Sequence, residues 1–203
     1  MLKIGITGGI GSGKSTVCHL FEKYNVPVYY ADDRAKWLMN NKEELKEKLK
    51  ITFGELVYDS EENLDRKYLA EIVFNDKQKL EILNSIEHPA VYEDSKEWQV
   101  EQQSLGVSYT LKEAALLFEA GSYLALDKII VVTAPEDVRI KRVMARDKVS
   151  REAVLARISK QMPQSKKEEL ADFVITNLEW ESIDIQVSKT HRKLIELSKR
   201  INI

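Results

Sequence analysis

The sequence contains few of the residues that form disulfides, tight turns or linkers. It has one cysteine, Cys18, so an internal disulfide is excluded and a reducing compartment is favoured. Only four prolines and eight glycines occur among 203 residues, which excludes a fibrous or low-complexity chain. The formal net charge of -2 does not suggest a nucleic-acid-binding protein, so any anion site must be local.

Long apolar runs are also missing. No run reaches the roughly 18 apolar residues that a membrane span requires, and the opening residues MLKIGITGG do not resemble a signal peptide. No set of Cys and His residues has the spacing of a zinc site. We therefore expect a cytoplasmic protein that binds neither membranes nor nucleic acid and exists as a monomer or a small homo-oligomer.

Strand-like and helical segments alternate along the chain. Strands are expected at residues 2–7, 26–32, 127–135 and 172–177, with helices from Lys14 to about Tyr24, over 135–170 and over 181–200. Residues 33–103 are mostly helical, with a break near Pro89, and are too long for an ordinary crossover. The pattern predicts an α/β fold, with a parallel sheet flanked by helices and an inserted helical subdomain.

The stretch GITGGIGSGKST, residues 5–16, holds five of the eight glycines. It fits the P-loop pattern G-x-x-x-x-G-K-[ST] and lies between a predicted strand and a predicted helix. Backbone N–H groups and a helix N-terminus there form an anion site, which side chains at Gly11 or Gly13 would block. Lys14 is expected to reach the β- and γ-phosphates, Ser15 to bind Mg²⁺ and Thr16 to touch the α-phosphate. The predicted nucleotide-binding residues of this loop are Gly9, Ile10, Gly11, Ser12, Gly13, Lys14, Ser15 and Thr16.

Other P-loop classes fit poorly. No Asp lies three residues before any Gly, and NKEE at 41–44 is not the N-K-x-D motif of GTPases. With these classes excluded, the sequence favours a small phosphotransferase that uses ATP and Mg²⁺. Asp32 is predicted at the carboxyl end of the second strand, where a carboxylate can take a proton from an attacking hydroxyl. Asp32 or Asp33 could instead cap the helix that begins with RAKWLMNN.

An ordered set of motifs is similar to that of the dephospho-CoA kinase family. The set spans nearly the whole chain: TGGIGSGKST at 7–16, the segment ending at Asp32, FG at 53–54, LDRKYLAEIVF at 64–74, EHP at 87–89, LLFEAG at 116–121, RIKRVMARD at 139–147, RISKQM at 157–162 and ADFVITN at 171–177. Three positions depart from the family pattern. Tyr30 replaces the first Asp of D-A-D, Ala115 replaces a Pro, and Arg139 replaces a common Gln.

The resemblance implies transfer of the γ-phosphoryl group of ATP to the ribose 3′-hydroxyl of dephospho-CoA. It implies one P-loop kinase domain, 1–203, with a nucleotide-binding core at about 1–32, 105–138 and 171–203. The insert at about 33–104 would bind substrate, and a helical lid would cover about 139–170. The predicted catalytic residues are Asp32, Lys14 and Arg142, and Arg142 and Arg146 are expected to grip phosphates. The predicted substrate-binding residues are Thr7, Asp32, Arg66, His88 and Glu119.

Each of these side chains also has an ordinary structural interpretation. Arg142 and Arg146, with Arg157 further along, could form a solvated basic helix face, and Arg66 could pair with a nearby carboxylate. His88 could be a structural hydrogen-bond partner, and Glu119 could cap an element. Two other functions also stay open. One is a different small-molecule or nucleotide P-loop kinase, and the other is an ATP-binding regulator without catalysis.

Overall fold

The computed structural model describes residues 1–74, 76–178 and 180–201 and divides into two compact units. The core unit comprises residues 1–30 and 101–203, and the helical unit comprises residues 31–100. The helical unit begins two residues earlier than the insert expected from the sequence and ends four residues earlier. Asp32 therefore belongs to the helical unit, whereas the segment expected to form a lid lies within the core unit.

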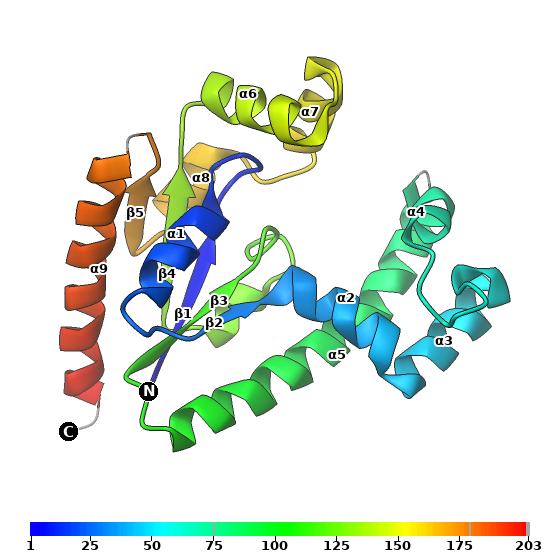
Figure 1. The fold of residues 1–203 in the computed structure, drawn as a ribbon, viewed down its shortest axis with the longest axis horizontal. Helices are drawn as coiled ribbons and strands as arrows, with labels where there is room; N and C mark the ends of the chain where they lie inside the picture. Colours follow the sequence, from blue (N-terminus) through cyan, green and yellow to red (C-terminus); the bar gives the residue numbers. More distant parts are fainter. Residues whose placement is uncertain (75, 179, 202–203) are drawn as a thin grey trace. The chain divides into compact units, whose positions relative to one another are not determined.

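All five strands of the sheet belong to the core unit and run parallel. They are β1 (Leu2–Thr7), β2 (Val28–Tyr30), β3 (Tyr109–Glu113), β4 (Lys128–Thr133) and β5 (Phe173–Thr176), in the order β2-β3-β1-β4-β5 (Figure 1). The predicted α/β class is confirmed. β1 lies between β3 and β4, so the loop after Thr7 leaves the carboxyl edge of the sheet near its centre.

Strand β3 had no strand prediction, because Lys112 and Glu113 interrupt its apolar pattern. Both side chains are nevertheless buried, at 8% and 7% exposure. Burial lowers the pKa of Lys112, whose ammonium lies 5.7 Å from the centre of the Tyr29 ring. Central strands of a parallel sheet are covered on both faces, so β3 accepts polar residues only where they have local support.

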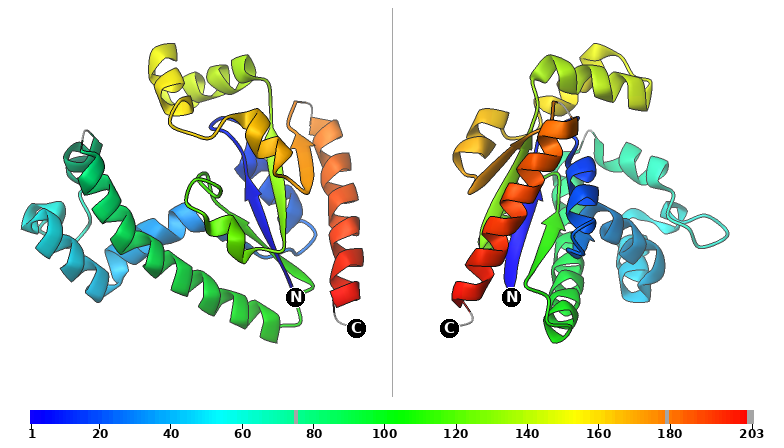
Figure 2. Two further views of the ribbon diagram at one scale, coloured as in Figure 1. Left: turned by 180° about the vertical axis from the view of Figure 1, so that it is seen from behind. Right: turned by 60° about the vertical axis from the view of Figure 1, so that its left-hand side comes forward.

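The described residues of the core unit also form five α-helices and one short 3₁₀ helix: α1 (Lys14–Glu22), η2 (Ser122–Ala125), α6 (Glu136–Asp147), α7 (Arg151–Ile158), α8 (Gln164–Glu169) and α9 (Trp180–Ile201). Helices α1 and α9 share one apolar cluster with the sheet, in which Cys18 is buried as packing. Figure 2 shows α9 alongside β5. His191 of α9 is partly buried. Its ring stacks on Tyr24, and its Nδ1 lies 2.7 Å from the Tyr109 hydroxyl.

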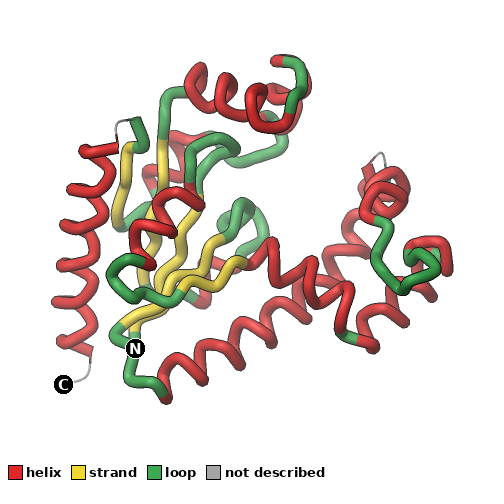
Figure 3. The backbone as a smooth tube through the Cα atoms, in the orientation of Figure 1, coloured by secondary structure: helices red, strands yellow, loops and turns green. Residues whose placement is uncertain are grey.

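The helical unit contains helices and loops but no strand of the sheet (Figure 3). Its helices are α2 (Ala31–Asn41), α3 (Glu43–Phe53), α4 (Arg66–Phe74) and α5 (Lys77–Ser104), whose last residues belong to the core unit. The predicted break near Pro89 was wrong, because α5 continues through it. Trp37 is 49% exposed, and the Arg34 guanidinium lies over its ring at 4.5 Å.

The position of Asp32 also differs from the prediction. Strand β2 ends at Tyr30, and Asp32 and Asp33 form the first turn of α2 instead of the end of a strand. Acidic residues stabilise the positive end of a helix dipole, which explains why the helix begins directly after Tyr30. Both carboxylates are exposed. Asp33 accepts a hydrogen bond from Lys36 at 2.5 Å.

Candidate functional site

The phosphate loop connects β1 to α1 and depends on close backbone approaches. Gly11 and Gly13 have φ angles of 80° and 84°, a region that L side chains rarely adopt. A Cβ atom at Gly13 would collide with the side-chain nitrogen of Asn177, and one at Gly11 would meet the Arg139 carbonyl. Gly11 and Gly13 are therefore needed for two reasons. They let the loop pack against the protein, and they leave space for an anion to approach the loop backbone.

The helix that follows the loop presents backbone donors. Gly13 caps α1, and residues 14–16 form its first turn, where an α-helix cannot pair its own N–H groups. The first intrahelical contact is the Val17 N–H to the Gly13 carbonyl, at 3.2 Å. Together with the helix dipole, these N–H groups make an anion site. Ser15 is exposed beside them.

Lys14 lies over the loop that precedes it. Its Nζ is 3.5 Å from the Gly8 carbonyl oxygen and 3.7 Å from Oε1 of Glu113 on β3. The Lys14 and Glu113 side chains are only 12% and 9% exposed. The sequence identified Lys14 but gave no sign of Glu113, which lies almost 100 residues away in an unpredicted strand. A carboxylate here keeps the ammonium close to the position expected for phosphate.

Arg142 joins the lid segment to the phosphate loop through Asn177. The Arg142 Nη2 donates to the Asn177 carbonyl at 3.2 Å, and the Asn177 side-chain nitrogen donates to the Ser12 carbonyl at 2.8 Å. Within the described residues, Nη1 of Arg142 and Oγ of Ser12 are buried without a hydrogen-bond partner. Buried donors normally have partners, so Nη1 is a donor prepared for a ligand. Asn177, at the carboxyl end of β5, was not predicted as a site residue.

Two further arginines of the predicted lid, Arg146 and Arg157, bind a carboxylate of the same segment. Arg146 binds the Asp147 carboxylate at 2.7 and 3.1 Å, and Arg157 binds the same carboxylate at 2.7 Å. Hydrogen bonding from Arg146 lowers the pKa of Asp147. Both arginine side chains are largely exposed and have further N–H donors besides those that bind Asp147, so a phosphate could bind them in addition to Asp147.

Two glutamines bind the first half of the loop. Oε1 of Gln164 accepts the Gly9 N–H, and Oε1 of Gln161 accepts the Ile10 N–H, each at 2.9 Å. A cavity of about 750 Å³ opens beside this contact. Its lining includes Arg139, which is 4% exposed and donates through Nε to the Ala134 carbonyl at 3.1 Å. None of these contacts could be read from local sequence.

The predicted substrate residues Thr7 and Glu119 lie in a polar network of the core unit. The Thr7 hydroxyl donates to the Ala115 carbonyl at 3.4 Å. Glu119 binds the fully buried Lys167 ammonium at 2.9 Å and accepts the Met162 N–H at 2.8 Å. Burial would raise the pKa of Glu119, but the hydrogen bonds from Lys167 and Met162 outweigh burial and hold it below its ordinary value.

The remaining predicted substrate residues, Asp32, Arg66 and His88, lie in the helical unit and are exposed. Arg66 begins α4, as predicted. Partial burial lowers the pKa of His88. The neighbouring Glu87 is less exposed, and burial followed by the charge of Asp32 raises its pKa. Asp32 therefore has a second carboxyl group within electrostatic range in its own unit.

The described residues contain no group of three or more His, Cys, Asp or Glu side chains that could hold a metal. Oxygen atoms close to the phosphate loop include the Ser15 hydroxyl, one residue from Lys14, and the Glu113 carboxylate, which lies 3.7 Å from the Lys14 ammonium. Hydroxyl and carboxylate oxygens suit Mg²⁺, which usually keeps several waters and shares phosphate oxygens of the substrate. None of the described helices is long and apolar enough to cross a membrane.

Comparisons with known proteins agree with this arrangement. A family model described as dephospho-CoA kinase matches residues 2–181. A dephospho-CoA kinase from Salinibacter ruber is 42% identical over 177 residues, 87% of this chain and 89% of the relative. A crystal structure from Thermus thermophilus has a TM-score of 0.84 at 38% identity and covers 95% of this chain and 96% of its own. The dephospho-CoA kinase from Campylobacter jejuni has a TM-score of 0.72 at 30% identity, with coverage of 96% and 97%.

Proposed function

This chain belongs to the dephospho-CoA kinase family, and on that premise we propose which of its residues carry out the phosphoryl transfer. ATP is the phosphoryl donor and the ribose 3′-hydroxyl of dephospho-CoA is the acceptor. The proposal depends on the link from Arg142 through Asn177 to the phosphate loop, with Nη1 of Arg142 buried and unpartnered among the described residues. A guanidinium so placed is ready for an anionic ligand at the loop.

The phosphates of ATP bind the N–H groups of Gly11 and residues 13–16, with Lys14 and Arg142 as cations. Charge spreads over the equatorial oxygens of the transferred group, so fixed donors and cations stabilise the transition state. Arg146 is the second phosphate contact of the lid. Ser15 and the phosphates would hold Mg²⁺, which would supply positive charge beside the oxygens of the transferred group.

Asp32 is the proposed base that accepts the proton of the ribose hydroxyl. Its position in the first turn of an exposed helix leaves the carboxylate accessible to substrate. Arg66 and His88 provide polar groups for the acidic acceptor from the same unit. Thr7 and Glu119 are the predicted substrate contacts of the core unit, although Glu119 already binds Lys167.

The acceptor is tested by measuring ADP release from MgATP with dephospho-CoA, AMP, adenosine, pantetheine and shikimate in parallel. Turnover with dephospho-CoA alone is expected. Turnover with another acceptor would assign a different small-molecule kinase, and ATP binding without any turnover would favour a regulator.

The base is tested with Asp32→Asn, and Asp33→Asn serves as the matched control from the same helical turn. We expect Asp32→Asn to bind ATP normally and to lose at least about 100-fold in turnover, the scale of general-base catalysis. Asp33 is bound to Lys36, so its amide variant should keep most activity. Equal rates for the two variants would remove Asp32 from the mechanism.

A further inference from the structure

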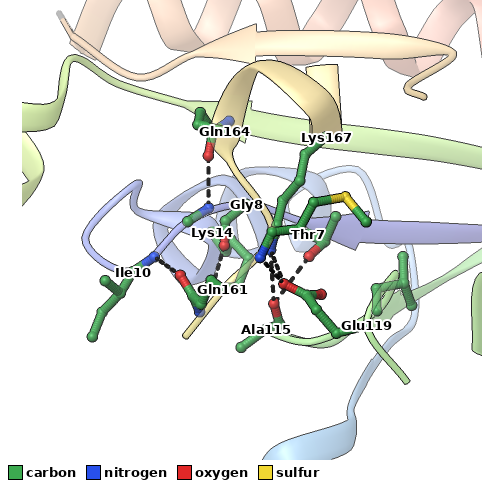
Figure 4. Close-up of polar contacts among 12 residues, drawn as sticks. Thr7, Gly8, Ile10, Lys14, Ala115, Glu119, Gln161, Gln164 and Lys167 are labelled. Atoms are coloured by element: carbon green, nitrogen blue, oxygen red, sulfur yellow. Dashed lines mark hydrogen bonds and ion pairs between the residues drawn. The ribbon is translucent and has the colours of Figure 1, made fainter. Parts of the chain in front are cut away.

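Part of the phosphate loop is already hydrogen bonded to side chains of the protein. The Gly9 and Ile10 N–H groups donate to Gln164 and Gln161, as the dashed lines in Figure 4 show. A phosphate could take these two N–H groups only by breaking bonds of 2.9 Å. The Ser12 N–H donates to the Gly9 carbonyl at 3.0 Å, so the N–H groups that remain for ATP are those of Gly11, Gly13 and the first turn of α1.

The segment that carries both glutamines is itself fixed to the sheet. Lys167, with 0% exposure, binds Glu119 at 2.9 Å and donates to the Ala115 carbonyl at 3.4 Å. Glu119 also accepts the Met162 N–H, between the two glutamines. Thr7, the last residue of β1, donates to the same Ala115 carbonyl (Figure 4). Residues 161–167 are therefore held against the strand that leads into the phosphate loop.

The side-chain chemistry at these two positions suits a neighbour of ATP. A carboxamide oxygen accepts an N–H without adding negative charge, whereas a carboxylate would repel a triphosphate. Gln164 is oriented by its own donor, because Nε2 lies 3.2 Å from Glu168 and 3.5 Å from the Val132 carbonyl. A Cβ atom at Gly9 would meet Gln164 and Arg139, so Gly9 permits the close approach.

We infer that Gln161 and Gln164 are positioning residues for ATP. They hold the first half of the phosphate loop in one shape, so that the N–H groups of Gly11 and residues 13–16 are directed at the phosphates before ATP arrives. Such preorganisation lowers the ordering cost of binding and therefore acts on ATP affinity. The inference rests on the proposed use of ATP but does not depend on the identity of the acceptor.

The test uses two variants of Gln161 with nearly the same shape. Gln161→Met removes the acceptor oxygen, and Gln161→Glu keeps an acceptor but adds a charge. Asn40→Leu is the matched control, because Oδ1 of Asn40 accepts the Leu64 N–H at 2.8 Å within the helical unit. MgATP affinity is measured by calorimetry without acceptor, together with both KM values, Tm and hydrogen exchange of the Ile10 amide.

Gln161→Met should weaken ATP binding roughly 3- to 10-fold, the net value of one hydrogen bond, and leave KM for dephospho-CoA within about 2-fold. The Ile10 amide should exchange faster. Gln161→Glu should bind ATP poorly in dilute buffer and recover as salt screens the added charge, a response that a packing role would not give. Asn40→Leu should lower Tm without changing ATP affinity.

Unchanged ATP affinity in Gln161→Met would overturn the inference, as would a parallel rise of both KM values together with a loss of Tm. If Gln161→Met does not fold, Gln164→Met replaces it under the same criteria. If the wild-type protein binds ATP but does not phosphorylate dephospho-CoA, the proposed reaction is contradicted. The inference about ATP positioning is then still tested by the ATP affinities of the variants.

Discussion

The buried pair of Lys167 and Glu119 gives a prediction whose size follows from the structure. The Lys167 side chain is 0% exposed, the Glu119 side chain is 21% exposed, and their charged atoms are 2.9 Å apart. In Glu119→Leu the ammonium keeps only the Ala115 carbonyl, at 3.4 Å, among the contacts described. Breaking a buried pair costs about 3–5 kcal/mol, and the partial exposure of Glu119 favours the lower end, about 3 kcal/mol.

The same substitution also removes the acceptor of the Met162 N–H, which adds about 1 kcal/mol. Glu119→Leu should therefore lower the free energy of unfolding by about 4 kcal/mol, which corresponds to roughly 8–16 °C in Tm for a chain of this size. The double variant Glu119→Leu/Lys167→Met has no unpaired charge and should lose only about 1 kcal/mol.

Urea denaturation followed by circular dichroism measures these differences. The control is Glu81→Gln, which disrupts an ion pair with Lys77 whose side chains are 65% and 89% exposed and should change stability by less than about 0.5 kcal/mol. A loss below about 1 kcal/mol in Glu119→Leu would refute the reasoning, as would a double variant no more stable than the single. Normal stability with a raised KM for dephospho-CoA would restore Glu119 to substrate binding.

Three further predictions follow from the arrangement of charged groups. Arg142→Met should lower kcat about 100- to 1,000-fold in the coupled ADP assay, the value of one transition-state donor, and Arg146→Met should lower it less because Arg146 already has a partner. Burial lowers the pKa of His191, so the unfolded chain binds a proton there more readily than the folded chain. The free energy of unfolding should therefore fall as the pH drops through about 6.5. In thermal melts, His191→Phe should reduce this dependence of Tm on pH. Burial and the charge of Asp32 raise the pKa of Glu87. Ionisation of Glu87 therefore lowers the stability of the folded chain at pH values above the ordinary carboxyl pKa. Glu87→Gln should raise Tm at pH 7 and have little effect at pH 4.

The parts of the site that the sequence predicts are those built from neighbouring residues. Gly8 to Thr16 form one contiguous segment whose residue spacing matches the P-loop pattern. Arg142 belongs to a helix whose basic residues recur at helical spacing. By contrast, the contacts of Gly9, Ile10 and Ser12 reach partners 155, 151 and 165 residues away. Glutamine and asparagine are common surface residues. The local sequence around Gln161, Gln164 and Asn177 therefore does not indicate that their side chains bind the phosphate loop.

The missed features of the fold have equally physical causes. Strand β3 was not predicted, because the charged residues Lys112 and Glu113 interrupt the apolar pattern of a buried strand. Their burial follows from tertiary packing, which a local pattern does not show. The boundary at Asp32 was misplaced because β2 has only three residues and the acidic pair starts a helix at once. Pro89 did not end α5, since tertiary packing can override the loss of one backbone donor.

The link between Asn177 and Ser12 has a consequence for synthesis on the ribosome. Residues 5–16 emerge first, but the amide that holds the Ser12 carbonyl is translated 165 positions later. At roughly 5–20 residues per second, the nascent chain displays a phosphate loop for on the order of ten seconds without the groups that shape it. A chain truncated before Asn177 would keep the glycine-rich motif but lack the amide that holds the Ser12 carbonyl, and we expect it to bind ATP more weakly.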